Sequence, residues 1–308
     1  MWTYIFRRFL QAIPVILGVA IISFFFSEMS GSPIRAMLGP KVSPEVLQKV
    51  TEHYGYDKPA PERFFIYLSN LLHGNLGYSL FNAGLPVTDL IATGMKVTLK
   101  LSLGAILFAI CLGLPLGILS ARYPNSIFDY AASSFAGVAV AVPAFFLAIV
   151  LKLVFSVWLG WFPITGYDPG SLKHLVLPCF ALGLISTAAT ARLTRNCLLD
   201  TLSQDYVRTG RAKGCAQGRV LLGHALPNAL VPVITIIGSD FAGLLCGAIL
   251  TETVFGLPGV GLLLSSAVTQ RDLPMVMGCC IMMSLIFVFA NLLVDISYAF
   301  LDPRIRYE

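Results

Sequence analysis

Residues 205–214 read DYVRTGRAKG, from Asp205 to Gly214, and Leu226-Pro227 follows shortly afterwards. This stretch is polar and basic, although 56% of the chain is hydrophobic and only 12% is charged. Soluble domains carry about 25% charged residues, so a chain of this composition lacks the polar surface of a water-soluble fold. A charged helix between membrane spans is available to a soluble molecule. The stretch therefore indicates a partner before it indicates a substrate.

The same stretch has the signals of a short helix of about ten residues. Ser203 is expected to cap its start, and Asp205 lies in the first turn, where the helix dipole favours acidic groups. Arg211 and Lys213 lie in the last turn, and Gly214 is expected to end the helix in a left-handed conformation. Side chains three and four apart are expected to share one face: Leu199, Leu202, Tyr206 and Thr209. Charge alone leaves open a basic loop that is merely anchored to anionic lipid.

Six apolar runs are long enough to cross a bilayer, which takes about 20 residues of helix. We therefore predict an all-α polytopic membrane protein with six transmembrane helices. The runs are 9–26, 97–120, 131–159, 175–191, 229–255 and 275–300. Pro143 is expected to kink the third span.

The positions of lysine and arginine predict the orientation, because short cytoplasmic connections are enriched in these residues. One side of the membrane holds Arg7, Arg8, Arg122, Arg192, Arg195, Arg208, Arg211, Lys213, Arg219, Arg304 and Arg306. Short loops on the other side hold only Lys173 and Arg271. Both termini and the loop 192–228 are therefore predicted to be cytoplasmic. The resulting organisation is an N-terminal helix (1–28), an external cap (29–96), a transmembrane domain (97–300) and a tail (301–308).

The external cap is predicted to contain two helices. The first starts at Ser43-Pro44-Glu45 and ends at Gly55, and the second runs from Pro61-Glu62 to Gly74. The second helix has an apolar face made of Phe64, Leu68, Leu71 and Leu72. Such a cap could seal the outer mouth of a pathway or contact an external protein, and a packed cap without a ligand role is an equal alternative.

Polar groups inside spans are the candidates for a translocation pathway, because charge in the bilayer is costly. Asp240, beside Ser239, is near the middle of the fifth span, and it is expected either to meet a cationic substrate group or to fix helix packing by a hydrogen bond. Glu252 near the end of that span is a candidate gate residue. Pro258, within GLPGVG, is expected in a re-entrant or turning element. Lys152 is expected to extend outward to the membrane surface.

The spacing from Gly214 to Leu226-Pro227 resembles the EAA loop of bacterial ABC importer permeases. Arg208, Thr209 and Gly210 stand where that pattern has Glu, Ala and Ala. Further segments are similar to the oligopeptide, dipeptide and nickel permeases of this family: DYVRTGRAKG, HALPNALVPVIT, ETVFGLPGVG, RDLPMVMG, LDPRIR, YGYDKP and GNLGYS. The resemblance covers nearly the whole chain.

This resemblance implies the permease subunit of a type I ABC importer in the bacterial inner membrane. The implied partners are a homologous second permease, two cytoplasmic ATP-binding subunits and an external solute-binding protein, in addition to the bilayer. Resemblance and helix geometry together assign the contact with the ATPase to Asp205, Tyr206, Arg208, Thr209, Arg211, Ala212, Lys213 and Gly214. ATP and Mg²⁺ are expected on the partner subunits, since the sequence has no phosphate-binding GxxxxGK[ST] loop and the chain is not expected to be an enzyme.

Small peptides are the substrate that the family motifs favour, and nickel or a metal chelate is the alternative. The four histidines are scattered and the seven cysteines lack metal-site spacing, so no metal or cofactor is expected in this chain. An ion-coupled secondary transporter would explain Asp240 but not the charged helix, and no internal repeat supports it. A membrane enzyme lacks a catalytic motif, and no nucleic-acid partner is expected.

Overall fold

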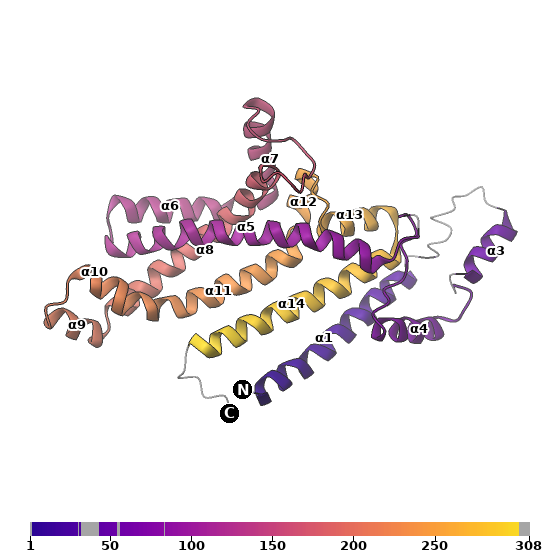
Figure 1. The fold of residues 1–308 in the computed structure, drawn as a ribbon, viewed down its shortest axis with the longest axis horizontal. Helices are drawn as coiled ribbons and strands as arrows, with labels where there is room; N and C mark the ends of the chain where they lie inside the picture. Colours follow the sequence, from indigo (N-terminus) through magenta and orange to yellow (C-terminus); the bar gives the residue numbers. More distant parts are fainter. Residues whose placement is uncertain (1, 30, 32–42, 54–55, 83, 302–308) are drawn as a thin grey trace. The chain divides into compact units, whose positions relative to one another are not determined.

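The computed structural model describes residues 2–29, 31, 43–53, 56–82 and 84–301, and these residues are mostly helical (Figure 1). They contain no β-strand, only an isolated bridge between Tyr78 and Pro86. The fold is therefore the predicted all-α class. Chain contacts define two compact units. The first holds 99–257 and the chain from 289, and the second holds 2–98 and 258–288.

Long apolar helices account for most of the predicted spans. Five helical segments are long and apolar enough to cross a membrane without a break. They correspond to α1 (Trp2–Met29), α5 (Val87–Arg122), α8 (Lys173–Leu202), α11 (Leu226–Gly247) and α14 (Leu273–Leu301). Two further helix pairs pass the same test together, each across a short break, which gives up to seven candidate spans.

The predicted third span is two helical segments and not one kinked helix. The helix α6 (Ile127–Ala141) and the continuous segment formed by α7 (Ala144–Leu151) and η1 (Lys152–Trp158) meet at 101°. Pro143 stands immediately before α7 and starts that segment. A kink was predicted, but the structure has a complete break between two helical segments. A proline can begin a helix, but it cannot donate the backbone hydrogen bond that continues one.

The predicted fifth span is also interrupted. The helix α11 ends at Gly247, and α12 (Ile249–Phe255) follows Ala248, whose ψ of 11° departs from helical geometry. Gly256 then adopts φ 64°, the left-handed region in which glycine carries no side-chain penalty. Hydrophobicity identifies an apolar run but not the positions at which its backbone turns. The single span predicted over 229–255 therefore contains both α11 and α12.

The helix α8 forms the centre of the first unit and packs on α5 through small residues. A Cβ atom at Gly117 of α5 would lie 2.6 Å from the Ala191 carbonyl oxygen, and one at Gly113 would lie 2.9 Å from that of Thr187. At Gly183 of α8, the added atom would lie 2.7 Å from the Ala105 carbonyl oxygen. Glycines on both helices therefore allow the backbones to approach closely, as small residues do between membrane helices.

The second unit contains α1, the cap helices, the start of α5, α13 (Val260–Gln270) and the start of α14. The two predicted cap helices are present as α3 (Pro44–His53) and α4 (Ala60–Leu72), while Gly55 lies outside the described residues. The predicted apolar face of α4 is wrong at Leu72, which is 87% exposed. Phe64 of that face does pack, with its ring 5.1 Å from the ring of Phe24.

Two polar clusters fix the second unit. Arg63 of α4 forms an ion pair with Glu28 of α1 at 2.5 Å and lies over the Tyr56 ring, and burial raises the pKa of Tyr56 to about 12. Asp272, fully buried before α14, accepts hydrogen bonds from the Ser79 hydroxyl and from the backbone N–H groups of residues 80, 81 and 275. Asp272 thereby holds the segment that precedes α5 against the start of α14.

Candidate coupling site

The predicted charged helix is present as α9 (Asp205–Ala212). Its N-cap is Gln204, not Ser203. The Ser203 hydroxyl donates instead to the Asp200 carbonyl at the end of α8, so Ser203 closes one helix and does not open the next. Gly214 adopts φ 82°, which confirms the predicted left-handed stop. The Cys215 N–H returns to the Gly210 carbonyl at 3.3 Å, which closes the last turn of α9.

The anchor of α9 is Val207, which the sequence analysis did not select. Val207 is fully buried in a cluster with Leu198 of α8, Ala121 of α5 and Ala229 of α11. The predicted apolar face was wrong, because Leu199 and Leu202 belong to α8 and Tyr206 is 46% exposed. The signal available in the sequence was that Val207 is the one aliphatic residue larger than alanine in DYVRTGRAKG. A single buried side chain therefore ties α9 to three long helices.

A polar contact ties α9 to the start of α11. The Asn228 side-chain amide donates to the Tyr206 hydroxyl at 2.9 Å and to the His224 carbonyl at 3.3 Å. Gly210 faces the same region, since a Cβ atom added there would lie 3.8 Å from the His224 ring. Tyr206 is thus a link inside the chain as well as an exposed surface residue.

The other predicted contact residues of α9 point to solvent. The side chains of Asp205 and Arg208 are 98% and 71% exposed, and they form an ion pair at 3.6 Å. Exposed pairs of this kind contribute at most about 1 kcal/mol, so they do not hold the helix in place. The remaining predicted residues of this surface are also exposed: Thr209, Arg211, Ala212, Lys213 and Gly214. The structure therefore brings the predicted residues together on one accessible helix and its stop.

The connection from α9 to α11 is helical after a turn at residues 213–216. After α10 (Gln217–Arg219), the segment η2 (Val220–Ala225) is a π-helix that leads directly into Leu226 and Pro227. A proline ring clashes with the carbonyl one turn earlier in an α-helix, and the wider π turn relieves this clash without ending the helix. Figure 1 shows α9 and α10 at one end of the pair formed by α8 and α11.

A buried ion pair close to this region was not predicted. The Arg195 guanidinium of α8 binds Asp129 of α6 through two bonds, at 2.5 and 2.7 Å. Asp129 also accepts from the Ser120 hydroxyl of α5 and from the Asn125 N–H. Arg195 was counted as a basic loop residue, but its charge is matched within the protein. The pair joins α5, α6 and α8 close to the cluster that holds Val207.

The candidate pathway residues lie apart from α9. Asp240 is half-buried in α11 beside Ser186 of α8, and Ser239 is exposed. Twelve residues separate Asp240 from Asn228 on the same helix, which corresponds to about 18 Å. Glu252 is fully buried on α12, and Pro258 lies in the connection that follows α12.

Lys152 does not extend outward as expected. Its ammonium group donates to the Val254 carbonyl of α12 at 2.5 Å. Val254 is near the end of α12, where backbone carbonyls lack an intrahelical donor, so a partly buried ammonium group can bind there. Lys152 therefore joins η1 to α12, and the hydropathy of its own span gave no sign of this contact.

Comparison with known proteins identifies relatives along the whole chain. The family model described as "Binding-protein-dependent transport system inner membrane component" matches residues 113–307, and the model of its N-terminal region matches residues 1–102. The oligopeptide transport system permease protein AppB of Bacillus subtilis is 38% identical over 316 residues, and the glutathione transport system permease protein GsiC of Escherichia coli is 39% identical over 309. Both matches cover 100% of each chain.

Solved structures agree on the fold. A chain of the methionine ABC transporter MetNI, in an inward-facing conformation, aligns with a TM-score of 0.56 and 18% sequence identity. That match covers 69% of the present chain and 96% of the other. A chain of an amino acid ABC transporter aligns with a TM-score of 0.54 and covers 71% and 95%.

Proposed function

Because this chain belongs to the family of inner-membrane components of binding-protein-dependent transport systems, we propose that it forms half of the pathway of an importer for small peptides. It is a permease subunit of an ABC importer and a multi-pass protein of the bacterial inner membrane, and it is not an enzyme. The peptide assignment is supported by relatives that are named as oligopeptide, dipeptide and glutathione permeases, at 37–39% identity over the full chain.

The proposed topology has six membrane crossings, with both termini and the loop 192–228 in the cytoplasm. The segment 29–96 would then be an external cap, and 97–300 the transmembrane domain. The basic side chains exposed on α9 support this orientation. Arg195 does not support this orientation, because its charge is paired with Asp129.

The observation that carries the coupling proposal is the way α9 is attached. One face of α9 is fixed by buried Val207 to a cluster that includes α8 and α11, while its charged face is exposed. A cytoplasmic ATPase that grips the exposed face would therefore move the ends of two long membrane helices as a rigid lever. Tyr206 would carry part of this motion through Asn228 of α11.

Two cytoplasmic ATP-binding subunits would bind ATP and Mg²⁺ and close on each other during the cycle. Their closure would displace α9, open the pathway outward and let it accept solute from an external binding protein. A homologous second permease would supply the other half of the pathway. On this chain, we assign the contact to the exposed residues of α9 and to Gly214. Arg208, Arg211 and Lys213 would supply polar contacts to the ATPase surface.

Asp240, Ser239, Glu252, Pro143 and Pro258 remain the proposed pathway or gate residues. The neighbourhood of Asp240 and Ser186 supports a role in packing α11 on α8. A half-buried carboxylate would also be able to meet the ammonium group of a peptide during passage. Pro143 and Pro258 lie at breaks between helices, where irregular backbone is tolerated if it is buried in protein or lines a cavity.

The test is uptake by the full system reconstituted in vesicles, with the second permease, the ATP-binding subunits and the binding protein. Labelled dipeptide should accumulate with ATP, whereas accumulation of radioactive nickel without dipeptide uptake would overturn the peptide assignment. Replacing Tyr206 by alanine should lower transport per ATP hydrolysed, while Gln217→Ala, an exposed change on neighbouring α10, should not. Equal coupling ratios in both variants would contradict the proposed role of α9.

A further inference from the structure

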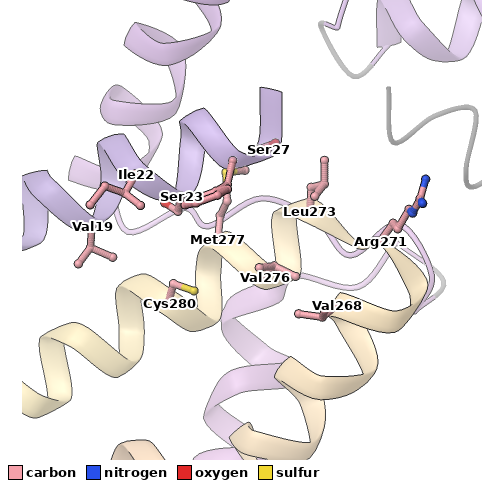
Figure 2. A pocket seen from close by; sticks show the side chains of 11 residues that line it. Val19, Ile22, Ser23, Ser27, Val268, Arg271, Leu273, Val276, Met277 and Cys280 are labelled. Atoms are coloured by element: carbon pink, nitrogen blue, oxygen red, sulfur yellow. The ribbon is translucent and has the colours of Figure 1, made fainter. Parts of the chain in front are cut away.

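The second unit contains an apolar groove outside the proposed pathway and coupling site. The groove lies along α1 and the start of α14, has a volume of about 510 Å³, and ends beside Arg271 (Figure 2). Its walls include Ile22 and Phe26 of α1 and Val268 of α13, which are 57%, 63% and 59% exposed. The hydroxyl of Ser23 in the wall donates to the Ala20 carbonyl, so it does not require a polar ligand.

The groove lies within the membrane-spanning parts of the two helices. The apolar stretches of α1 and α14 cover Phe9–Met29 and Leu273–Val294, and the groove follows α1 from Val19 to Ser27. Eight residues of helix correspond to about 12 Å, close to the thickness of one leaflet of about 15 Å. An acyl chain that follows the groove would therefore have apolar surroundings over a length close to the depth of one leaflet.

Arg271 places a cation where both spans end. Figure 2 shows its side chain beyond Leu273, at one end of the groove. The neighbouring Asp272 carboxylate is occupied by Ser79 and backbone N–H groups, and no ion pair of Arg271 occurs among the residues that the structure describes. Arg271 adopts φ 59°, a left-handed conformation that costs a non-glycine residue about 1 kcal/mol. This conformation ends α13, so Arg271 extends from the stop of that helix.

We propose that this groove binds one membrane phospholipid, with an acyl chain between α1 and α14 and the phosphate on Arg271. Arginine suits this position because its planar guanidinium binds phosphate through two parallel hydrogen bonds. The bound lipid would fill a space between α1 and α14 and so stabilise the packing of the N-terminal helix.

The charge at the end of the groove favours a lipid as its occupant. An apolar groove that ends at a cation matches the two parts of a phospholipid, an apolar acyl chain and an anionic phosphate.

The test uses the complete transporter in nanodiscs that contain phosphatidylglycerol with a photoactivatable group in one acyl chain. Crosslinks should map to the groove, to Ile22, Val276 or Cys280. Ile22→Trp should fill the groove and lower the crosslink yield at least tenfold, whereas Leu285→Trp, on α14 outside the groove, should leave the yield unchanged. Equal yields in the two tryptophan variants would overturn the proposal.

The headgroup contact is tested with Arg271→Gly and Arg271→Lys. Glycine removes the charge and also relieves the left-handed strain, so a loss of lipid in this variant does not come from misfolding. Arg271→Gly should lower retention of phosphatidylglycerol in native mass spectrometry about fivefold, because one basic group near a lipid surface contributes that factor to binding. Arg271→Lys should restore part of the retention. Unchanged retention in Arg271→Gly would refute the phosphate contact. Quantitative disulfide formation between Ile22→Cys and a cysteine of the second permease would show that protein fills the groove.

Discussion

The starts of α6 and α9 both carry an aspartate in the first turn that is paired with an arginine, but the two pairs have opposite environments. Asp129 of α6 is almost fully buried and binds Arg195 of α8 through two bonds. Asp205 of α9 is 98% exposed, and its distance to Arg208 is 3.6 Å. The first pair holds helices of the permease together, and the second leaves its charges available to a partner. The same residue types therefore serve packing in one region and leave exposed charge in the other.

The largest expected effect comes from removing the apolar anchor that lets α9 expose its charges. Val207→Asp would bury a carboxylate without a partner in the cluster of Leu198 and Ala229, at a cost of about 3 kcal/mol or more. Amide hydrogen exchange of residues 205–212 should then rise about 100-fold. Thr209→Asp, an exposed change on the same helix, is the matched control. Retained protection in Val207→Asp would show that α9 is held by its polar contacts.

The second effect breaks the buried pair. Asp129→Asn leaves Arg195 without its counter-ion and should lower the free energy of unfolding by about 2 kcal/mol. This value is below the roughly 3–5 kcal/mol expected for a fully buried pair, because the Arg195 side chain is still 26% exposed. The matched change Asp205→Asn should alter stability by less than about 0.5 kcal/mol. Thermal unfolding of the purified complex measures both variants, and similar shifts would remove the distinction between the two pairs.

A smaller effect is expected at the end of α9. Gly214→Ala puts a Cβ atom on a residue with φ 82° and should destabilise the stop by about 1 kcal/mol. Space is not the reason, because an added Cβ atom would have no neighbour within 4 Å. Gly218→Ala, which is equally open but has no positive φ, is the control. If both variants unfold at the same temperature, conformational strain is not what selects glycine at 214.

The smallest effect on stability is expected for Arg208→Gln, below about 0.5 kcal/mol, because the ion pair that it removes is exposed. Under the proposed function, the same change should weaken the contact with the ATPase and lower transport per ATP hydrolysed. Thermal unfolding and ATP-coupled uptake, both measured on one preparation, separate the effect on stability from the effect on coupling. Loss of stability without a change in coupling would place Arg208 with the structural residues.

The sequence predicted α9 well at its end and poorly at its start. Gly214 marks the end because few residues other than glycine tolerate a left-handed conformation, so the residue type carries the structural information. Ser203 looked like the cap of α9 because serine caps many helices, but its hydroxyl lies nearer the last turn of α8. Which of two adjacent helices a polar side chain serves depends on the backbone path between them.

The candidate site was predicted in the same uneven way. The charged residues of α9 were found because charge is rare in this chain, and the structure leaves them on one exposed surface. Val207 was missed because a single valine has no periodic pattern, and its burial comes from residues of α5, α8 and α11 that are distant in sequence. Lys152 was misjudged because its partner is a backbone carbonyl of α12, which no side-chain pattern reports.

The sequence alone determined the membrane class, most of the long helices, the family and the presence of the short charged helix α9. These properties follow from hydrophobicity, local capping and short-range spacing, all of which act between neighbours in the chain. The tertiary structure decided where the long apolar runs break, that Arg195 is paired with Asp129 while Arg208 is exposed, and that Arg271 lies at the end of an apolar groove. Burial and pairing depend on residues brought together across helices, so only the folded chain determines them.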